Sequence, residues 1–336
     1  MKFLSHLPEI AFTKPLFCGI LGNTLLSTVP GISGAGPTPQ DTLFTPVLDA
    51  ELVTRGSITS IPMKPNTPTG CPTPATITRA MMELCRIRPL FINAGLRHKP
   101  TIPCFDVYGE VGGDSRYGDA VPCAGELFSR GEIIGEILSD TSDLLVLGEC
   151  VPGGTTTALC VLRALGYNAA VSSSFVTNPI TQKEEICRLV LERIGEAGVN
   201  DPLDIIRYAG DPMMPVAAGI AKSYTGSLLF AGGTQMLAVC AVIKSMGLSL
   251  PSVVTTAYVR DDPSANVQAL ADQIGADMIY VDPDFGELGH PGLARYCIGE
   301  VKEGMGAGGA MCLAYLSGHS SDEIRRKILT SVNAYS

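Results

Sequence analysis

Short apolar runs alternate with longer amphipathic segments along most of the chain, from about Arg88 onward. The runs are hydrophobic at consecutive positions rather than at every second one. This is typical of strands in a parallel sheet that helices cover on both faces. We therefore expect buried strands at residues 89–93, 101–107, 143–149, 168–174, 227–232, 252–259 and 277–282.

The segments between these runs have the period of amphipathic helices. Residues 183–198 place apolar side chains on one face, and residues 264–277 do the same, with Ser264 as the candidate N-cap. Near the C-terminus, Ser320 and Glu323 have the spacing of a capping box. This alternation predicts an α/β fold: a doubly wound, mainly parallel, Rossmann-like sheet with helices on both faces, plus a smaller lobe.

Residues 1–85 have a different character. They are rich in proline, glycine, threonine and serine, and regular periodicity is sparse until the helical pattern of residues 73–87. We expect an irregular N-terminal lobe that packs on an α/β nucleotide-binding and catalytic domain at residues 86–336, whose C-terminal helices could join the smaller lobe. Because long ordered loops are often functional, the N-terminal loops could also cover a ligand site.

The composition argues against several classes of protein. The 336 residues carry a formal net charge of −9 and no cluster of lysine or arginine, so nucleic acid is not an expected partner. Hydrophobic residues make up 46% of the chain and charged residues 17%, which favours a large core over disorder. The apolar stretch at residues 14–32 is interrupted by Asn23, Thr24 and Pro30 and is too short to span a bilayer. We therefore expect a cytoplasmic protein that does not bind membranes.

The 11 cysteines are scattered, mostly inside apolar runs. Their number is odd and no pair has Cys-x-x-Cys spacing, which favours reduced thiols packed as small hydrophobic side chains over a disulfide framework. The four histidines have neither metal-site nor catalytic-triad spacing. We expect no metal site.

The sequence LGECVPGGTTTALC, residues 147–160, predicts a strand end, a glycine turn and a helix start. Backbone N–H groups at a helix N-terminus attract anions, and glycine lets a ligand approach closely. Gly153, Gly154, Thr155 and Thr156 are thus candidate phosphate ligands. ATP hydrolysis through this turn is not expected, because the Gly-Lys-Ser/Thr of a nucleoside-triphosphate loop is missing. The alternative is a structural turn with Thr155 as the N-cap.

A second candidate is Glu303, which precedes several glycines and an apolar helix. A carboxyl group buried at the mouth of such a stretch has a raised proton affinity and suits a general base. The alternative, which the residue pattern alone favours, is a solvated glutamate beside Lys302, with glycines that serve helix packing.

Two further features fall at the expected carboxyl edge of the sheet. Lys183 begins a helix after the strand predicted at 168–174 and could reach a phosphate, although a solvated lysine is the ordinary expectation. Gly232 ends the strand predicted at 227–232 and falls at the same edge as Gly153.

In this order, the motifs resemble nicotinate-nucleotide–dimethylbenzimidazole phosphoribosyltransferase, the enzyme that makes the lower-ligand nucleotide of cobamides. The resemblance covers about residues 71–315 and includes Glu-x-x-x-Gly-x-Thr-Thr at 149–156, the helix that begins with Lys183, and Glu-Gly-x-Gly-Ala at 303–307. Residues 19–39 are similar to a divergent branch of that family found in archaea and cyanobacteria.

The resemblance implies roles for individual residues. Glu303 would be the catalytic group that deprotonates the attacking base. The nucleotide's phosphate and ribose would contact Glu149, Gly153, Gly154, Thr155, Thr156, Lys183 and Gly232, and the base would contact Thr78, Gly304 and Gly306. The implied partners are nicotinate mononucleotide, an aromatic base and a second copy of the chain in a homodimer, with transfer by inversion and without a cofactor.

The chain also departs from the family pattern. Lys302 stands where the family usually has glycine, and Gly154 stands where its phosphate turn has asparagine. Residues 71–82 do not match the dimethylbenzimidazole pocket one for one, which leaves adenine, a phenol or a hydroxybenzimidazole open as the base. The alternative function is a nucleotide-binding carrier or regulator of the cobamide pathway without turnover.

Overall fold

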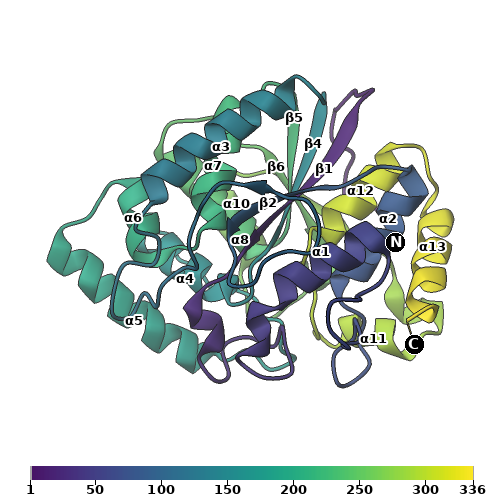
Figure 1. The fold of residues 1–336 in the computed structure, drawn as a ribbon, viewed down its shortest axis with the longest axis horizontal. Helices are drawn as coiled ribbons and strands as arrows, with labels where there is room; N and C mark the ends of the chain where they lie inside the picture. The colour runs from purple at the N-terminus through teal and green to yellow at the C-terminus, as the bar shows by residue number, and fades with distance from the viewer. Residues whose placement is uncertain (1, 336) are drawn as a thin grey trace.

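The computed structural model describes residues 2–335 and contains a seven-stranded sheet in the order β3-β2-β1-β4-β5-β6-β7 (Figure 1). All neighbouring strands are parallel. The chain winds from β1 outward to β3 and from β4 outward to β7, which confirms the predicted doubly wound α/β fold. The strands are β1 Pro15–Gly22, β2 Leu90–Gly95, β3 Phe105–Asp106, β4 Leu144–Cys150, β5 Ser227–Ala231, β6 Ser252–Thr256 and β7 Met278–Val281.

Helices cover both faces of this sheet (Figure 1). One face carries α3 Ala124–Ser139, α4 Gly154–Ala164, α5 Ile180–Ala197, α6 Pro202–Ala209, α7 Met213–Ser223, α8 Thr234–Ser245 and α10 Val267–Ile274. The other carries α1 Thr45–Arg55, α2 Pro74–Cys85, α11 Pro291–Cys297, α12 Ala307–Leu316 and α13 Ser321–Asn333. Four short helices lie in the connections: α9 Ala257–Arg260, η1 Leu25–Thr28, η2 Asp41–Leu43 and η3 Phe285–Leu288.

The alternation of side chains along the buried strands divides the core into two layers. In β4, Leu145 and Leu147 join the apolar core on one face, and Leu144 and Val146 join the core on the other. The second core brings together parts of the chain that are far apart in the sequence, since α2 packs against α12 and α13 (Figure 1). Within the described residues, no helix has the length and apolar character needed to cross a membrane.

The strand β1 corrects the sequence analysis, which treated residues 1–85 as irregular. Pro15–Gly22 pairs with β2 on one side and β4 on the other, so it lies inside the sheet. Two glycines in this run weaken its strand pattern. The tertiary structure requires one of them, because a methyl group at Gly19 would approach Phe91 to 2.9 Å.

Residues 168–174 were predicted as a strand, and the structure corrects this as well, since they form no strand. Side chains replace the neighbouring strand as hydrogen-bond donors. The ammonium group of Lys183 donates to the carbonyl of Ser172 at 2.7 Å. The ammonium group of Lys302 donates to the carbonyl of Ser173, also at 2.7 Å. The sequence pattern therefore correctly indicated a buried segment, but it wrongly predicted that the segment pairs with a neighbouring strand.

Predictions for the helix ends had mixed outcomes. The capping box of Ser320 and Glu323 is confirmed at the start of α13. The N-cap of α10 is Asn266, so the prediction for Ser264 was wrong; the Ser264 hydroxyl donates instead to Asp262 at 2.6 Å.

Candidate active site at the carboxyl edge of the sheet

A pocket opens at the carboxyl edge of the sheet, beyond β1 and β4, where the direction of winding reverses. Doubly wound folds bind their ligands at this position. The N-terminal loops form part of the wall. The pocket is lined by residues 32–37, 63–68, 149–155, 172–174, 233–235 and 301–304, together with Thr45, Leu48, Asp49, Ile58, Thr73, Pro74 and Val259.

The glycine turn after β4 forms one wall of the pocket. The N-cap of α4 is Gly153, in the left-handed region at φ 81°, so the alternative in which Thr155 is the N-cap was wrong. Because the cap residue has no side chain, the helix N-terminus is open to a ligand. Gly154 faces Gln235 so closely that an added methyl group would lie 1.6 Å from its side-chain oxygen, so a larger residue would require Gln235 to move.

Lys183 lies behind this turn rather than in the pocket wall. Its side chain is buried, and its ammonium group donates to Ser172 O at 2.7 Å and to Thr155 Oγ1 at 3.0 Å. Burial, and then the charge of Lys302, lower the pKa of Lys183 to about 7. An ammonium group can only donate, so the Thr155 oxygen accepts this bond and the hydroxyl hydrogen is free for a second acceptor.

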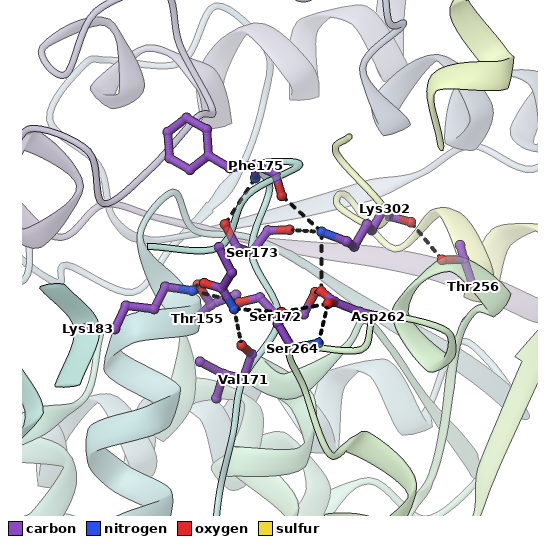
Figure 2. A network of polar contacts seen from close by, with 11 residues as sticks. Thr155, Val171, Ser172, Ser173, Phe175, Lys183, Thr256, Asp262, Ser264 and Lys302 are labelled. Carbon is purple, nitrogen blue, oxygen red and sulfur yellow. Dashed lines mark hydrogen bonds and ion pairs between the residues drawn. The ribbon is translucent and has the colours of Figure 1, made fainter. Parts of the chain in front are cut away.

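Lys302 is buried too, which corrects the expectation of a solvated Glu–Lys pair. Its ammonium group lies 3.2 Å from Asp262 Oδ2 and donates to the carbonyls of Ser173 and Phe175 at 2.7 and 3.1 Å (Figure 2). Asp262 also accepts a hydrogen bond of 2.6 Å from the Ser172 hydroxyl. This network joins the loop that carries Glu303 to residues 172–175.

The backbone around Glu303 is strained. Val301, Lys302 and Met305 have φ angles of 68°, 61° and 47°, a region that costs about 1–3 kcal/mol for each residue with a side chain. Polar contacts hold this backbone in place. The Thr256 hydroxyl donates to Lys302 O at 2.7 Å, and the Thr78 hydroxyl donates to Met305 O at 2.9 Å.

The Glu303 carboxyl group is partly exposed to the pocket and sits at the N-terminus of α12. The backbone N–H of Gly304 donates to Oε1 at 3.0 Å, and that of Gly308 donates to Oε2 at 3.2 Å. A methyl group at Gly308 would approach Oε2 to 2.8 Å, so glycine is required there. Burial raises the pKa of Glu303 to about 7 despite these N–H donors, which is the range of a general base.

Glu149 lies next to this group at the end of β4. Its side chain is buried, and Oε2 accepts a hydrogen bond of 3.1 Å from the backbone N–H of Val151. Burial, followed by the negative charges of Asp211 and Glu303, raises the pKa of Glu149 to about 8.

The structure brings some of the predicted site residues into the pocket and places others behind it. Glu149, Gly153, Gly154, Thr155, Glu303 and Gly304 line the pocket. Thr78, Thr156, Lys183, Gly232 and Gly306 do not line it. Thr78 donates to the backbone of the loop that carries Glu303, and Lys183 donates to Thr155 in the pocket wall. Gly232 lies against Glu149, and Gly306 packs against Gly148 and Phe17.

Sequence reasoning missed two parts of the wall. Residues 172–174 supply hydroxyl and carbonyl groups, and Asp49 supplies a third carboxyl group from α1. The signal for Asp49 was a charged residue in a helix segment that is otherwise apolar, Pro46–Ala50.

Among residues 2–335, no three His, Cys, Asp or Glu side chains are grouped in a way that could hold a metal ion.

These carboxyl groups predict a specific pH dependence of stability. The folded-state pKa is about 7 for Asp49 and Glu303 and about 8 for Glu149, above their ordinary values. Their protonated forms favour folding, so this stability is fully present below the ordinary carboxyl pKa of about 4, declines as the pH rises above that value and is gone above about pH 8. The pKa of Lys183 is lowered, so its effect on the free energy of unfolding changes only above about pH 7, where its contribution to stability grows with pH. We expect Tm to fall between pH 5 and 6.5 in differential scanning calorimetry.

The variant Glu149→Gln provides the check on this prediction, because it removes one titrating group from the same site. Its Tm should fall less steeply over the same pH range. An equally steep fall in the variant would assign the pH dependence to other groups.

The sheet, with its pocket at the switch point, gives the chain the fold of two solved structures from Thermus thermophilus. One is titled CobT: the TM-score is 0.61 at 14% identity, over 94% of this chain and 84% of that chain. The other is titled nicotinate-nucleotide-dimethylbenzimidazole phosphoribosyltransferase: the TM-score is 0.58 at 13% identity, over 96% of this chain and 83% of that chain. The resemblance seen in the sequence is thus confirmed at the level of the fold.

The chain belongs to the UPF0284 protein family. It is 42% identical over 328 residues to the family member from Methanosarcina mazei, which covers 94% of this chain and 93% of that protein. It is 43% identical over 321 residues to the member from Thermococcus gammatolerans, over 94% of this chain and 96% of that protein. These relatives are archaeal, as the resemblance implied. No family model matches the chain.

Proposed function

We propose that this protein is a phosphoribosyltransferase that moves the ribose phosphate of nicotinate mononucleotide onto an aromatic base, giving an α-ribotide for the lower ligand of a cobamide. The observation that carries the proposal is the position of Glu303. Its carboxyl group, with a pKa of about 7, faces the same pocket as the uncapped N-terminus of α4. The fold shared with the Thermus thermophilus phosphoribosyltransferase supports it.

The nucleotide's phosphate would bind at the start of α4. Gly153 and Thr155 present backbone N–H groups there, and Thr155 adds a hydroxyl group, whereas the N–H of Gly154 already donates to Val151 O at 2.9 Å. Lys183 acts through Thr155: by donating to its oxygen, it leaves the hydroxyl hydrogen available for a phosphate oxygen.

The reaction requires one proton acceptor. The bond between the ribose C1′ and the nicotinate nitrogen breaks, and the electron pair stays on that nitrogen, so the pyridinium ring leaves as the neutral pyridine ring of nicotinate. One nitrogen of the incoming base attacks C1′ from the opposite face, which inverts the β-linkage to α, while Glu303 takes the proton of the base's other nitrogen. Glu149, when ionised, would stabilise the positive charge that develops on the ribose. Much of the rate acceleration would come from holding the reactants in line.

The test is to incubate purified protein with nicotinate mononucleotide and a panel of bases, and to separate free nicotinate and any α-ribotide by chromatography. Product with at least one base supports the proposal and names the base. Calorimetric binding of the nucleotide without product from any base would instead support a carrier or regulator of the cobamide pathway.

We expect Lys183→Met to raise the Michaelis constant for nicotinate mononucleotide about 10- to 100-fold, because a charge-assisted contact to the phosphate-binding turn is lost. The value of kcat should change less. Steady-state kinetics measure both. Lys244→Met is the matched control, since Lys244 also donates to a backbone carbonyl, that of Ile274, outside the pocket lining. An unchanged Michaelis constant in Lys183→Met would leave Lys183 with a purely structural role.

A further inference from the structure

Asp49 is a buried carboxyl group of the pocket that the proposed reaction does not use. It lies on α1, is 7% exposed and lines the same pocket as Glu303. The remainder of this wall is largely apolar and includes Leu48, Pro65 and Pro74. A charged group in such a wall needs a reason, because desolvating a carboxylate is costly unless partners compensate for the lost water.

Its partners within the protein are few and weak. The Thr73 hydroxyl donates to Oδ1 at 3.1 Å, and the Cys150 thiol donates to Oδ2 at 3.7 Å. In the part of the chain that the structure describes, no lysine, arginine or histidine forms an ion pair with Asp49. Burial raises the pKa of Asp49 to about 7, even though both of these donors favour the ionised form. A carboxylate has about four acceptor sites, so it can accept further donors from a ligand.

Asp49 and Glu303 flank a contact between the start of α2 and the loop that precedes α12. Thr73, the hydrogen-bond partner of Asp49, is the N-cap of α2 and is followed by Pro74. Gly304, which follows Glu303, packs on that proline, since an added methyl group would lie 3.4 Å from Pro74 Cγ. Both carboxyl groups line one pocket and flank this contact, so a planar molecule that lies over Pro74 and Gly304 could meet one of them at each end.

We propose that Asp49 selects the acceptor base by accepting a hydrogen bond from a second donor group on it, distinct from the ring nitrogen that Glu303 deprotonates. The substrate class is then a planar heterocycle with a ring N–H and an additional amino or hydroxyl group, such as a 6-aminopurine or a hydroxylated benzimidazole. This inference rests on the proposed function, because it assigns the base of that reaction.

The chemistry of the wall disfavours the other bases. Dimethylbenzimidazole would direct methyl groups toward a carboxylate, and a simple phenol has one donor, which Glu303 would use. In both cases Asp49 would stay desolvated with only the two weak donors of Thr73 and Cys150. A site built to accept a hydrogen bond discriminates strongly against a ligand that lacks the donor.

The experiment compares pairs of bases that differ in the second donor alone: adenine with purine, and 5-hydroxybenzimidazole with benzimidazole. For each pair, kcat/KM is measured at pH 8 with nicotinate mononucleotide, and binding of the base is measured by calorimetry. The variants are Asp49→Ala and, as a matched control, Glu51→Gln. Glu51 is a buried carboxyl group on the same helix that accepts hydrogen bonds from Thr59 and Ser60 and is not part of the pocket wall.

We expect the unmodified protein to prefer the donor-bearing member of each pair by about 10- to 100-fold, in kcat/KM and in affinity. In Asp49→Ala both ratios should fall to about one, whereas Glu51→Gln should retain them. Ratios that stay the same in Asp49→Ala, or that are already near one in the unmodified protein, would overturn the inference.

The binding measurement separates this inference from the proposed function. If no base yields an α-ribotide but adenine binds more tightly than purine, and only Asp49→Ala removes this preference, the proposed function fails and the role of Asp49 stands. If product forms with all bases at similar rates, the proposed function stands and the role of Asp49 fails.

Discussion

Glu303→Gln is expected to lower turnover about 100- to 10,000-fold, the usual effect of removing a general base. Glutamine keeps the size of the side chain, and its oxygen at the Oε1 position can accept from the N–H groups of Gly304 and Gly308, which lie 3.0 and 3.3 Å from that atom. It cannot take the proton of the attacking base. The fold should be retained, because the substitution removes a buried charge rather than a packing contact. Single-turnover kinetics and a thermal melt measure the two effects.

The matched control for this variant is Glu300→Gln, three residues earlier in the same loop. The Glu300 carboxylate accepts hydrogen bonds from Thr67 and Arg295 at 2.7 and 2.5 Å and does not line the pocket. Its loss should affect stability more than chemistry. Near-normal turnover in Glu303→Gln would remove Glu303 from the mechanism, whatever the control does.

The second large effect is expected for Lys302→Met, which should lower the free energy of unfolding by about 3–5 kcal/mol. The substitution leaves Asp262 buried without its cation, and it removes the donor to the carbonyls of Ser173 and Phe175. Chemical denaturation measures the change. A loss below about 1 kcal/mol would mean that the pair contributes little to folding.

A double variant separates the ion pair from the position of Glu303. Lys302→Met combined with Asp262→Asn removes both charges, so much of the lost stability should return. Turnover should stay low, because the strained backbone before Glu303 still lacks its anchor to residues 172–175. If the double variant recovered turnover together with stability, Lys302 would act on the fold alone and would not position the base.

The sequence predicted most of what depends on short stretches of chain. Consecutive apolar residues identified β2, β4, β5, β6 and β7, and the spacing of Ser320 and Glu323 identified the start of α13. The glycine turn before Thr155 and the glycines after Glu303 were also visible, since a helix start and a close backbone approach each require particular residues at fixed local positions.

Only the tertiary structure showed which residues far apart in the sequence pair or form hydrogen bonds with one another. Pro15–Gly22 has a weak strand pattern and becomes a strand because β2 and β4 provide hydrogen bonds on both sides. Residues 168–174 were predicted as a strand and form none; lysine side chains 11 and 129 residues away, rather than a neighbouring strand, donate to two of their carbonyl groups.

Contacts between residues far apart in the sequence also determine the burial and charge pairing of the ionisable groups in the site. Whether Lys302 is solvated or buried depends on Asp262, 40 positions away in the sequence, and the role of Asp49 depends on a pocket wall that also includes Pro74 and Gly304. The sequence by itself determined which residues could form a nucleotide site and the class of fold that carries them. The tertiary structure alone decided which of them face the pocket, since burial and charge pairing arise from contacts that no local pattern encodes.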